Sequence, residues 1–155
     1  MLLRLLAAGT RMPHWVQEGY AEYATRLKGD FRLELVEIPL GPRTGGDPAK
    51  AIVKEGERML AQLADKPYIV ALQVRGKALS TQELADFLAR RSTEGRPVVF
   101  LIGGPDGLAP AVDARAELRW SLSALTLPHG LVRVVVAEAL YRAVSVLRGH
   151  PYHRG

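Results

Sequence analysis

Hydrophobic positions along the chain follow two spacings, one typical of strands and one typical of helices. Short apolar runs that stop at Gly or Pro predict strands, and longer segments with apolar residues three and four apart predict helices. The predicted strands cover residues 2–8, 31–38, 68–74, 97–102 and 120–127. The predicted helices cover residues 15–27, 48–63, 80–91, 108–117 and 131–148. Strands that alternate with helices predict an α/β fold with a mostly parallel sheet flanked by helices.

Local signals support these segments. Ser80 and Glu83 form a capping box at the start of the third helix. Gly76 is expected to turn the chain after the third strand. Residues 97–102 (PVVFLI) are apolar throughout, which is typical of a central parallel strand. No linker is long enough to divide the chain, so we expect one domain, residues 1–155.

Composition narrows the classes of function. The chain has no cysteine, which excludes disulfides, zinc–thiolate sites and thiol nucleophiles. The longest apolar stretch, residues 131–147, is interrupted by charged residues, so we expect no membrane span and a cytoplasmic location. The net charge is +5, and the segment from His129 onward holds four arginines against one acid. Such a basic patch suits RNA, although a merely soluble basic surface has the same composition.

A glycine-rich turn follows the most apolar predicted strand. Gly103 and Gly104 open the sequence GGPDGL, and ligands in parallel α/β sheets bind beyond the carboxyl ends of the strands. Adjacent glycines allow close approach of a ligand to the backbone and positive φ angles. The spacing matches neither a dinucleotide fingerprint nor a phosphate-binding loop, which disfavours an NAD-type dehydrogenase. The residues alone leave a ligand-binding loop and a simple tight turn as alternatives.

The next unusual segment alternates hydroxyl side chains with leucines. Residues 120–127 (WSLSALTL) end at Pro128. Their backbone can offer N–H and C=O groups while the leucines form an apolar slot that would suit an adenine ring. A buried strand with outward-facing hydroxyl groups has the same pattern, and the residues do not decide between the two.

The last predicted helix is apolar on nearly every side. A helix of this kind is normally buried, so we expect a second subunit to cover its outer face and the protein to form a homodimer. Glu138 and Arg142 are four residues apart and are expected to pair on one side of the helix. A solvated surface pair is the alternative.

The C-terminal end combines aromatic and cationic side chains. Tyr152, His153 and Arg154 are the kinds of residue that stack on an unstacked RNA base and contact its phosphates. Pro151 blocks a longer helix, so residues 151–155 are expected to form an extended arm. A frayed chain end is the alternative.

Four segments together resemble a known family. The sequences IGGPDGL, SLSALTLPH, LVRVVVAEALYRA and HPYHR are similar to the signatures of the methyltransferases that modify N3 of a pseudouridine in 23S ribosomal RNA. AAGTRMPHWVQEGYAEY and KEGERML match too, so the resemblance covers essentially the whole chain. It implies a SPOUT-type fold with a deep C-terminal trefoil knot and S-adenosylmethionine as the cofactor. It also implies a homodimer that acts on the assembled ribosome.

The resemblance also implies where the cofactor and the target base bind. The cofactor would lie against Leu72, Gly103, Gly104, Leu122, Ser123, Ala124, Leu125, Thr126 and Leu127. Tyr152, His153 and Arg154 would reach the target base from across the dimer interface. His129 or His153 could accept the proton of the imide nitrogen. Arg142 or Arg154 could stabilise the resulting anion.

Two other functions fit the same residues. One is a knotted methyltransferase that acts on transfer RNA, and the other is a ribosome-binding module without catalysis. The intact glycine turn and the hydroxyl-rich segment disfavour the second. The expected partners are the ribosome with its 23S RNA and a second copy of the chain, with no membrane and no metal ion.

Overall fold

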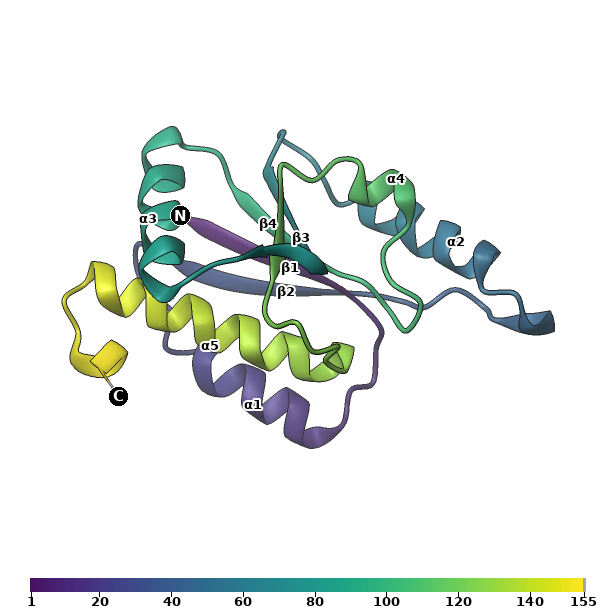
Figure 1. Ribbon diagram of the computed structural model, residues 1–155, viewed down its shortest axis with the longest axis horizontal. Helices are drawn as coiled ribbons and strands as arrows, with labels where there is room; N and C mark the ends of the chain where they lie inside the picture. Colours follow the sequence, from purple (N-terminus) through teal and green to yellow (C-terminus); the bar gives the residue numbers. More distant parts are fainter. Residues whose placement is uncertain (155) are drawn as a thin grey trace.

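The computed structural model describes residues 1–154 and has a five-stranded sheet at its centre (Figure 1). The strand order is β2-β1-β4-β3-β5, and each neighbouring pair is parallel. The strands are β1 (Leu2–Ala8), β2 (Arg32–Ile38), β3 (Tyr68–Ala78), β4 (Val98–Ile102) and β5 (Leu118–Ser121). The helices are α1 (His14–Ala24), α2 (Ala49–Leu60), α3 (Thr81–Glu94), α4 (Pro110–Asp113) and α5 (His129–Leu147). The predicted α/β fold with a parallel sheet is therefore confirmed.

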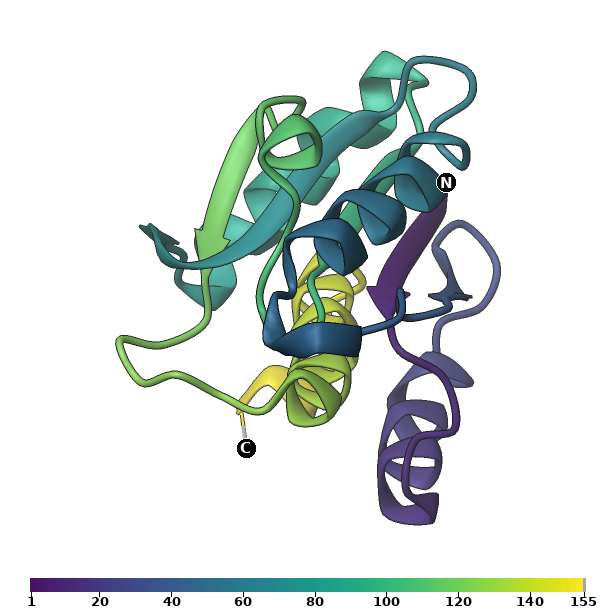
Figure 2. The same ribbon diagram turned by 90° about the vertical axis from the view of Figure 1, so that its right-hand side faces the viewer.

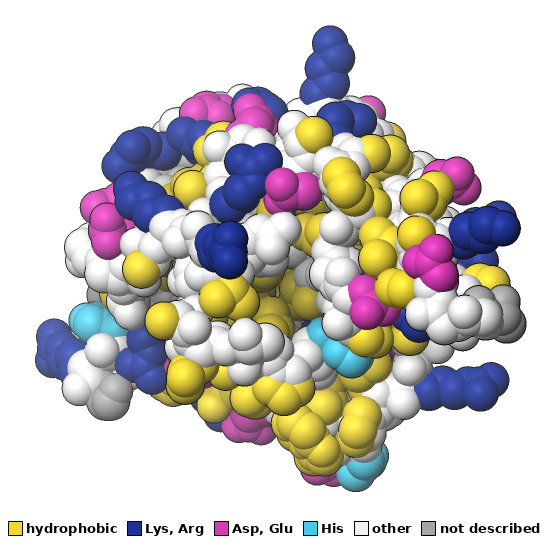
Figure 3. Space-filling view, turned by 45° about the vertical axis from the view of Figure 1, so that its right-hand side comes forward, with side chains coloured by type: hydrophobic (Ala, Val, Ile, Leu, Met, Phe, Trp, Pro, Cys, Tyr) yellow, Lys and Arg dark blue, Asp and Glu magenta, His cyan; other side chains and the backbone are white. Residues whose placement is uncertain are grey.

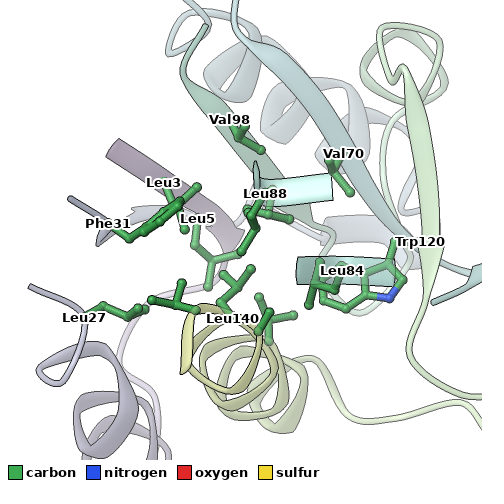
Figure 4. Close-up of a cluster of buried hydrophobic side chains, with 14 of the residues drawn as sticks. Leu3, Leu5, Leu27, Phe31, Val70, Leu84, Leu88, Val98, Trp120 and Leu140 are labelled. Carbon is green, nitrogen blue, oxygen red and sulfur yellow. The ribbon is translucent and has the colours of Figure 1, made fainter. Parts of the chain in front are cut away.

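Helices cover both faces of the sheet. The long helices α1, α3 and α5 pack on one face, and α2 and α4 lie together on the other (Figures 1 and 2). Successive residues of a strand point to opposite faces, so Leu5 belongs to the first core and Leu6 to the second. Figure 4 shows the first core, in which Leu140 of α5 lies among leucines from the sheet and α3. Strand β4 is buried along its whole length, as its apolar sequence predicted.

Gly76 does not turn the chain, and that prediction was wrong. Strand β3 continues through Gly76 to Ala78, with an irregularity in its pairing with β5 between Leu72 and Lys77. A Cβ at Gly76 would lie 2.6 Å from the backbone carbonyl of Arg119. The glycine therefore permits a close approach of two strand backbones, which is a known use of glycine inside strands.

The predicted strand over residues 120–127 is also wrong beyond Ser121. Ser121 donates a hydrogen bond from its hydroxyl group to the carbonyl oxygen of Ser123 at 3.0 Å, and the hydroxyl oxygen of Ser123 accepts one from the N–H of Leu125 at 2.9 Å. Such local side-chain bonds offer the backbone an alternative to a strand ladder. Residues 122–128 form a loop, and the predicted helix over residues 108–117 shortens to α4.

The chain end does not form an extended arm. Pro151–Arg154 forms a short 3-10 helix (η2) that packs against α5, because proline is compatible with the first turn of a helix. The Tyr152 hydroxyl group donates a hydrogen bond to Glu138 at 2.9 Å. The centroids of the Tyr152 and Tyr141 rings are 4.7 Å apart. Residue 155 lies outside the described residues. Within residues 1–154, no helix has both the length and the apolar content needed to cross a membrane.

We expect Gly76→Ala to destabilise the fold. The added methyl group would collide with the backbone of Arg119, which cannot rotate away, so the β3–β5 pairing must shift. Overpacking of this kind costs about 1–3 kcal/mol of unfolding free energy. Chemical denaturation should show this loss, whereas Lys77→Ala at the exposed neighbouring position should stay within about 0.5 kcal/mol of the parent. Equal stability of the two variants would contradict the close approach.

Candidate functional site

A pocket of about 530 Å³ opens beyond the carboxyl ends of β4 and β5, beside residues 72–74 of β3, which runs on past the end of β4. Figure 3 shows a hollow in this face of the molecule with hydrophobic side chains inside it. Three segments far apart in the sequence form its wall: residues 72–74 of β3, the turn after β4 (residues 103–108, the glycine turn) and the stretch that runs from the end of β5 through the following loop into the first turn of α5. The cofactor residues expected from the sequence that line this pocket are Leu72, Gly103, Gly104, Leu122, Ser123, Leu125, Thr126 and Leu127. Ala124 is exposed and does not line it.

The glycines at the start of the turn are also required by close contacts within the chain itself. A Cβ at Gly103 would lie 2.5 Å from the carbonyl carbon of Gly107, and a Cβ at Gly104 would lie 3.0 Å from the side chain of Leu40. The two residues are thus enclosed by their own chain. The expected positive φ occurs at Gly107, at 86°, and not at Gly103 or Gly104. The turn closes with a hydrogen bond from the N–H of Gly107 to the carbonyl oxygen of Gly104 at 3.0 Å.

The pocket combines apolar walls with backbone polar groups. Trp120 is buried at its inner end, whereas Leu125 on its wall is 72% exposed. The loop from residue 122 to residue 128 presents backbone groups that no strand ladder occupies. A concave, mostly apolar pocket with a few polar groups is the usual form of a small-molecule site. Its shape and chemistry fit a flat heterocycle held by backbone hydrogen bonds.

His129 is the sequence-predicted catalytic residue that lies at this pocket. It is the first residue of α5 and lines the pocket wall. Burial, followed by the positive charge of Arg133, lowers the pKa of His129 below its ordinary value of 6.5. The imidazole is therefore neutral at physiological pH, which is the form that accepts a proton.

Arg133 is a residue of this region that the sequence reasoning did not single out. Its side chain is only 2% exposed and hydrogen-bonds to Glu37 at 2.7 Å and to the carbonyl oxygen of Gly9 at 2.8 Å. It thereby joins α5 to the ends of β1 and β2 beneath His129. The available signal was a charged residue inside an otherwise apolar helix, since a buried charge requires specific partners.

A second cluster lies at the other end of α5. Arg142 and Glu138 pair at 2.8 Å, as their spacing predicted, and Glu138 also accepts the hydrogen bond from Tyr152. Burial and then this hydrogen bond raise the pKa of Tyr152 to about 12. The phenol therefore keeps its proton at neutral pH and can donate a hydrogen bond but cannot act as a base. His153 is half-buried beside it, and Arg154 is exposed.

One chain does not bring the two clusters together. His129 and Arg142 are separated by thirteen residues of one helix, which corresponds to about 20 Å at 1.5 Å per residue. Figure 1 shows the C-terminal end at the far end of α5 from the loop that enters this helix. Tyr152, His153 and Arg154 therefore lie far from their own pocket. Among residues 1–154, no group of three or more His, Asp or Glu side chains could hold a metal ion.

The pocket gives a direct test of the expected cofactor site. We expect Gly103→Ala to force the glycine turn open, because its Cβ would collide with the backbone at Gly107. Overpacking of about 1–3 kcal/mol would weaken S-adenosylmethionine binding about ten- to hundredfold in calorimetry. Gly29→Asn is the matched control, because Gly29 lies outside the pocket lining, a Cβ there meets nothing within 4 Å and asparagine tolerates a positive φ. Unchanged affinity in the Gly103 variant would place the ligand elsewhere.

The fold resembles solved methyltransferase structures. A probable methyltransferase from Bordetella pertussis Tohama I superposes with a TM-score of 0.57 at 19% identity, covering 92% of this chain and 93% of the other. A probable methylase family protein from Haemophilus influenzae Rd KW20 gives a TM-score of 0.56 at 15% identity, covering 97% of this chain and 69% of the other. At this level of identity the comparison shows a shared fold.

The sequence is much closer to two curated proteins, each named ribosomal RNA large subunit methyltransferase H. The one from Pseudomonas fluorescens is 56% identical over 155 residues, covering 99% of this chain and 100% of the relative. The one from Alkalilimnicola ehrlichii is 59% identical over 155 residues, covering 99% of both chains. A family model described as "Predicted SPOUT methyltransferase" matches residues 1–153. The chain therefore belongs to the SPOUT methyltransferase family.

Proposed function

We propose that this protein transfers a methyl group from S-adenosylmethionine to N3 of a pseudouridine in the 23S RNA of assembled ribosomes in the cytoplasm. The observation that carries the proposal is the similarity, along nearly the whole chain, to curated ribosomal RNA large subunit methyltransferases. The pocket at the carboxyl ends of the strands supports it, because it offers a site of suitable size and chemistry for the methyl donor.

The residues of the pocket fit S-adenosylmethionine. Leu122, Leu127 and Leu72 supply apolar surface for the adenine ring, and the backbone of residues 122–128 supplies hydrogen-bonding groups for its edge. The glycine turn supplies a further wall without side chains. When bound there, S-adenosylmethionine supplies a methyl group that is already activated as a sulfonium. The protein then needs only to orient the target base and to accept the proton of the target nitrogen.

The target nitrogen of pseudouridine carries a proton at neutral pH and must lose it before it can be methylated. His129 is the best-placed acceptor, because it lines the pocket and its lowered pKa keeps it neutral. Tyr152 is protonated and paired with Glu138, so its role is to orient the base or stack on it. Arg154 supplies a positive charge for the anionic base or a neighbouring phosphate. Arg142 holds Glu138 and thereby the position of Tyr152.

A homodimer accounts for the separation of these residues. The tail of one protomer would complete the pocket of its partner, since in its own chain it lies toward the far end of α5 from the pocket (Figure 1). The surface of α5 supports the same arrangement: one side is buried in its own chain, but Val135 and its neighbours on the other side stay partly exposed. An apolar face that a chain leaves partly open is typical of a subunit interface. The C-terminal trefoil knot belongs to the same proposal and rests on the family resemblance.

Two assays separate this function from its alternatives. Purified protein is incubated with labelled S-adenosylmethionine and either ribosomal particles or transfer RNA, and the modified nucleotide is mapped by mass spectrometry. We expect a methylated pseudouridine in 23S RNA and no label in transfer RNA. Label in transfer RNA would favour a different substrate. Absence of both methylation and cofactor binding would favour a non-catalytic ribosome-binding protein.

The pH dependence of the reaction tests the role of His129. Because the pKa of His129 is lowered, the neutral base persists below pH 6.5, and the acidic fall of kcat/KM should lie below that value. We expect His129→Gln to lower the rate about a hundredfold or more and to remove this acidic limb. His153→Gln is the matched control. If the limb disappears in the His153 variant and persists in the His129 variant, the base is His153.

Mixing two inactive variants tests whether the site is shared between protomers. His129→Gln and Arg154→Ala would each inactivate a homodimer, but a mixed dimer has one site in which both residues are intact. With random subunit exchange, we expect roughly a quarter of the parent activity to return. Each variant alone should keep its dimeric state in light scattering. If mixing restores nothing although mixed dimers form, His129 and Arg154 act within one chain.

A further inference from the structure

The glycine turn has one side chain that points away from the pocket. Residues 103, 104, 105, 107 and 108 line the pocket, but Asp106 does not. The Asp106 side chain is 37% exposed and accepts a hydrogen bond from Nε of Arg43 at 2.8 Å. Asp106 thus links the turn to Arg43, outside the pocket.

Arg43 connects this turn to helix α2. It lies between β2 and α2, in the loop of residues 39–48 (the β2–α2 loop), and its guanidinium group contacts Glu55 of α2 at 2.7 Å. Nε of the guanidinium faces Asp106, whereas Nη1 and Nη2 face Glu55. A planar group with several fixed donors can bridge two carboxylates in this way, and a lysine cannot.

Glu55 is a rigid anchor for this bridge. Its side chain is 4% exposed, and its Oε2 atom also accepts a hydrogen bond from the N–H of Gly41 at 2.9 Å. A carboxylate at this depth requires charged or hydrogen-bonding partners, so Arg43 and Gly41 fix its position. The Arg43–Glu55 pair therefore fixes Arg43 relative to α2, and Arg43 in turn fixes Asp106.

A second contact reinforces the first. Leu40 of the β2–α2 loop and Glu55 stand directly behind Gly104, where a Cβ would lie 3.0 Å from Leu40 and 3.3 Å from Glu55. The loop thus supports the turn through an ion pair at Asp106 and a packing contact at Gly104. Neither Leu40 nor Arg43 lines the pocket, so both contacts reach the turn from outside it.

We propose that Arg43 is a positioning residue that holds the glycine turn in its cofactor-binding shape by bridging Asp106 to the buried Glu55. The inference rests on the proposed function, because it takes the ligand of the pocket to be S-adenosylmethionine. Neither Arg43 nor Asp106 lines the pocket. They act by restricting the turn before the ligand arrives, which reduces the ordering that binding would otherwise require.

A double-mutant cycle measured by calorimetry with S-adenosylmethionine tests this role. We expect Asp106→Asn to weaken binding about fivefold and Arg43→Ala to weaken it by at least as much. The double variant should bind no more weakly than Arg43→Ala, because the two residues act through one link. If the losses multiply instead, Asp106 acts independently of Arg43 and the proposal fails.

Stability and kinetics separate positioning from simple loss of fold. Asp106→Asn keeps the Arg43–Glu55 pair, so the melting temperature of this variant should match that of the parent. Arg43→Ala leaves Glu55 without its cation, so this variant should be less stable. With ribosomal particles, Asp106→Asn should raise the KM for the cofactor about fivefold and change kcat less than twofold. Arg96→Ala is the control, since it removes a comparable pair with Glu117, also 2.8 Å long, away from the pocket, and should leave cofactor affinity unchanged.

The outcomes distinguish this inference from the proposed function. If the parent protein does not bind S-adenosylmethionine, the proposed function is overturned and this inference with it. If the parent binds and Asp106→Asn binds equally well, only the role of Arg43 is overturned. Equal weakening by Arg96→Ala would show a general effect of lost ion pairs and would also overturn it.

Discussion

The complete burial of β4 is the constraint on which the rest of the structure depends. Every residue from Val98 to Ile102 is enclosed by neighbouring strands and by helices on both faces. Such a strand has no exposed surface for polar groups, so the groups that could bind a ligand lie where the strand ends. Because β3, β4 and β5 run parallel, the loop after β5 leaves the sheet at the same edge as the glycine turn, and residues 72–74 of β3 line the same pocket. One buried strand thus creates the pocket from three separate segments.

The sequence was sufficient for the fold class and for most of the pocket. Apolar periodicity identified the strands, and the capping box at Ser80 and Glu83 is present as predicted, with Ser80 accepting from the N–H of Glu83 at 3.0 Å. It failed at Gly76 and at residues 122–127. At Gly76 the backbone conformation depends on a neighbouring strand that is distant in sequence, and at residues 122–127 it depends on local side-chain hydrogen bonds. The spacing of apolar residues contains neither kind of information. The roles of Arg133 and Arg43 were missed for the same reason, because their partners lie 96 and 63 residues away.

Pocket residues and chain-end residues differ in how they are held. The pocket wall consists largely of backbone and leucines, and its shape depends on close contacts such as that of Gly103 with Gly107. The chain end is held by a few polar and aromatic contacts of Tyr152 with Glu138 and Tyr141. The first arrangement depends on backbone that an added side chain would displace, whereas the second depends on side-chain contacts at a partly exposed chain end. A pocket shaped by backbone and a chain end held by side chains are consistent with the cofactor-binding and RNA-contacting roles proposed for them.

Helix α5 connects these two regions, and its orientation gives each an electrostatic bias. Peptide dipoles aligned over its 19 residues place partial positive charge at the first turn and partial negative charge at the last. His129 is at the positive end, where protonation is disfavoured, in the same direction as the effect of Arg133. Arg148 follows the negative end, where a cation is favoured. A single helix dipole thus favours a neutral imidazole at the pocket and a positive charge where the C-terminal segment begins.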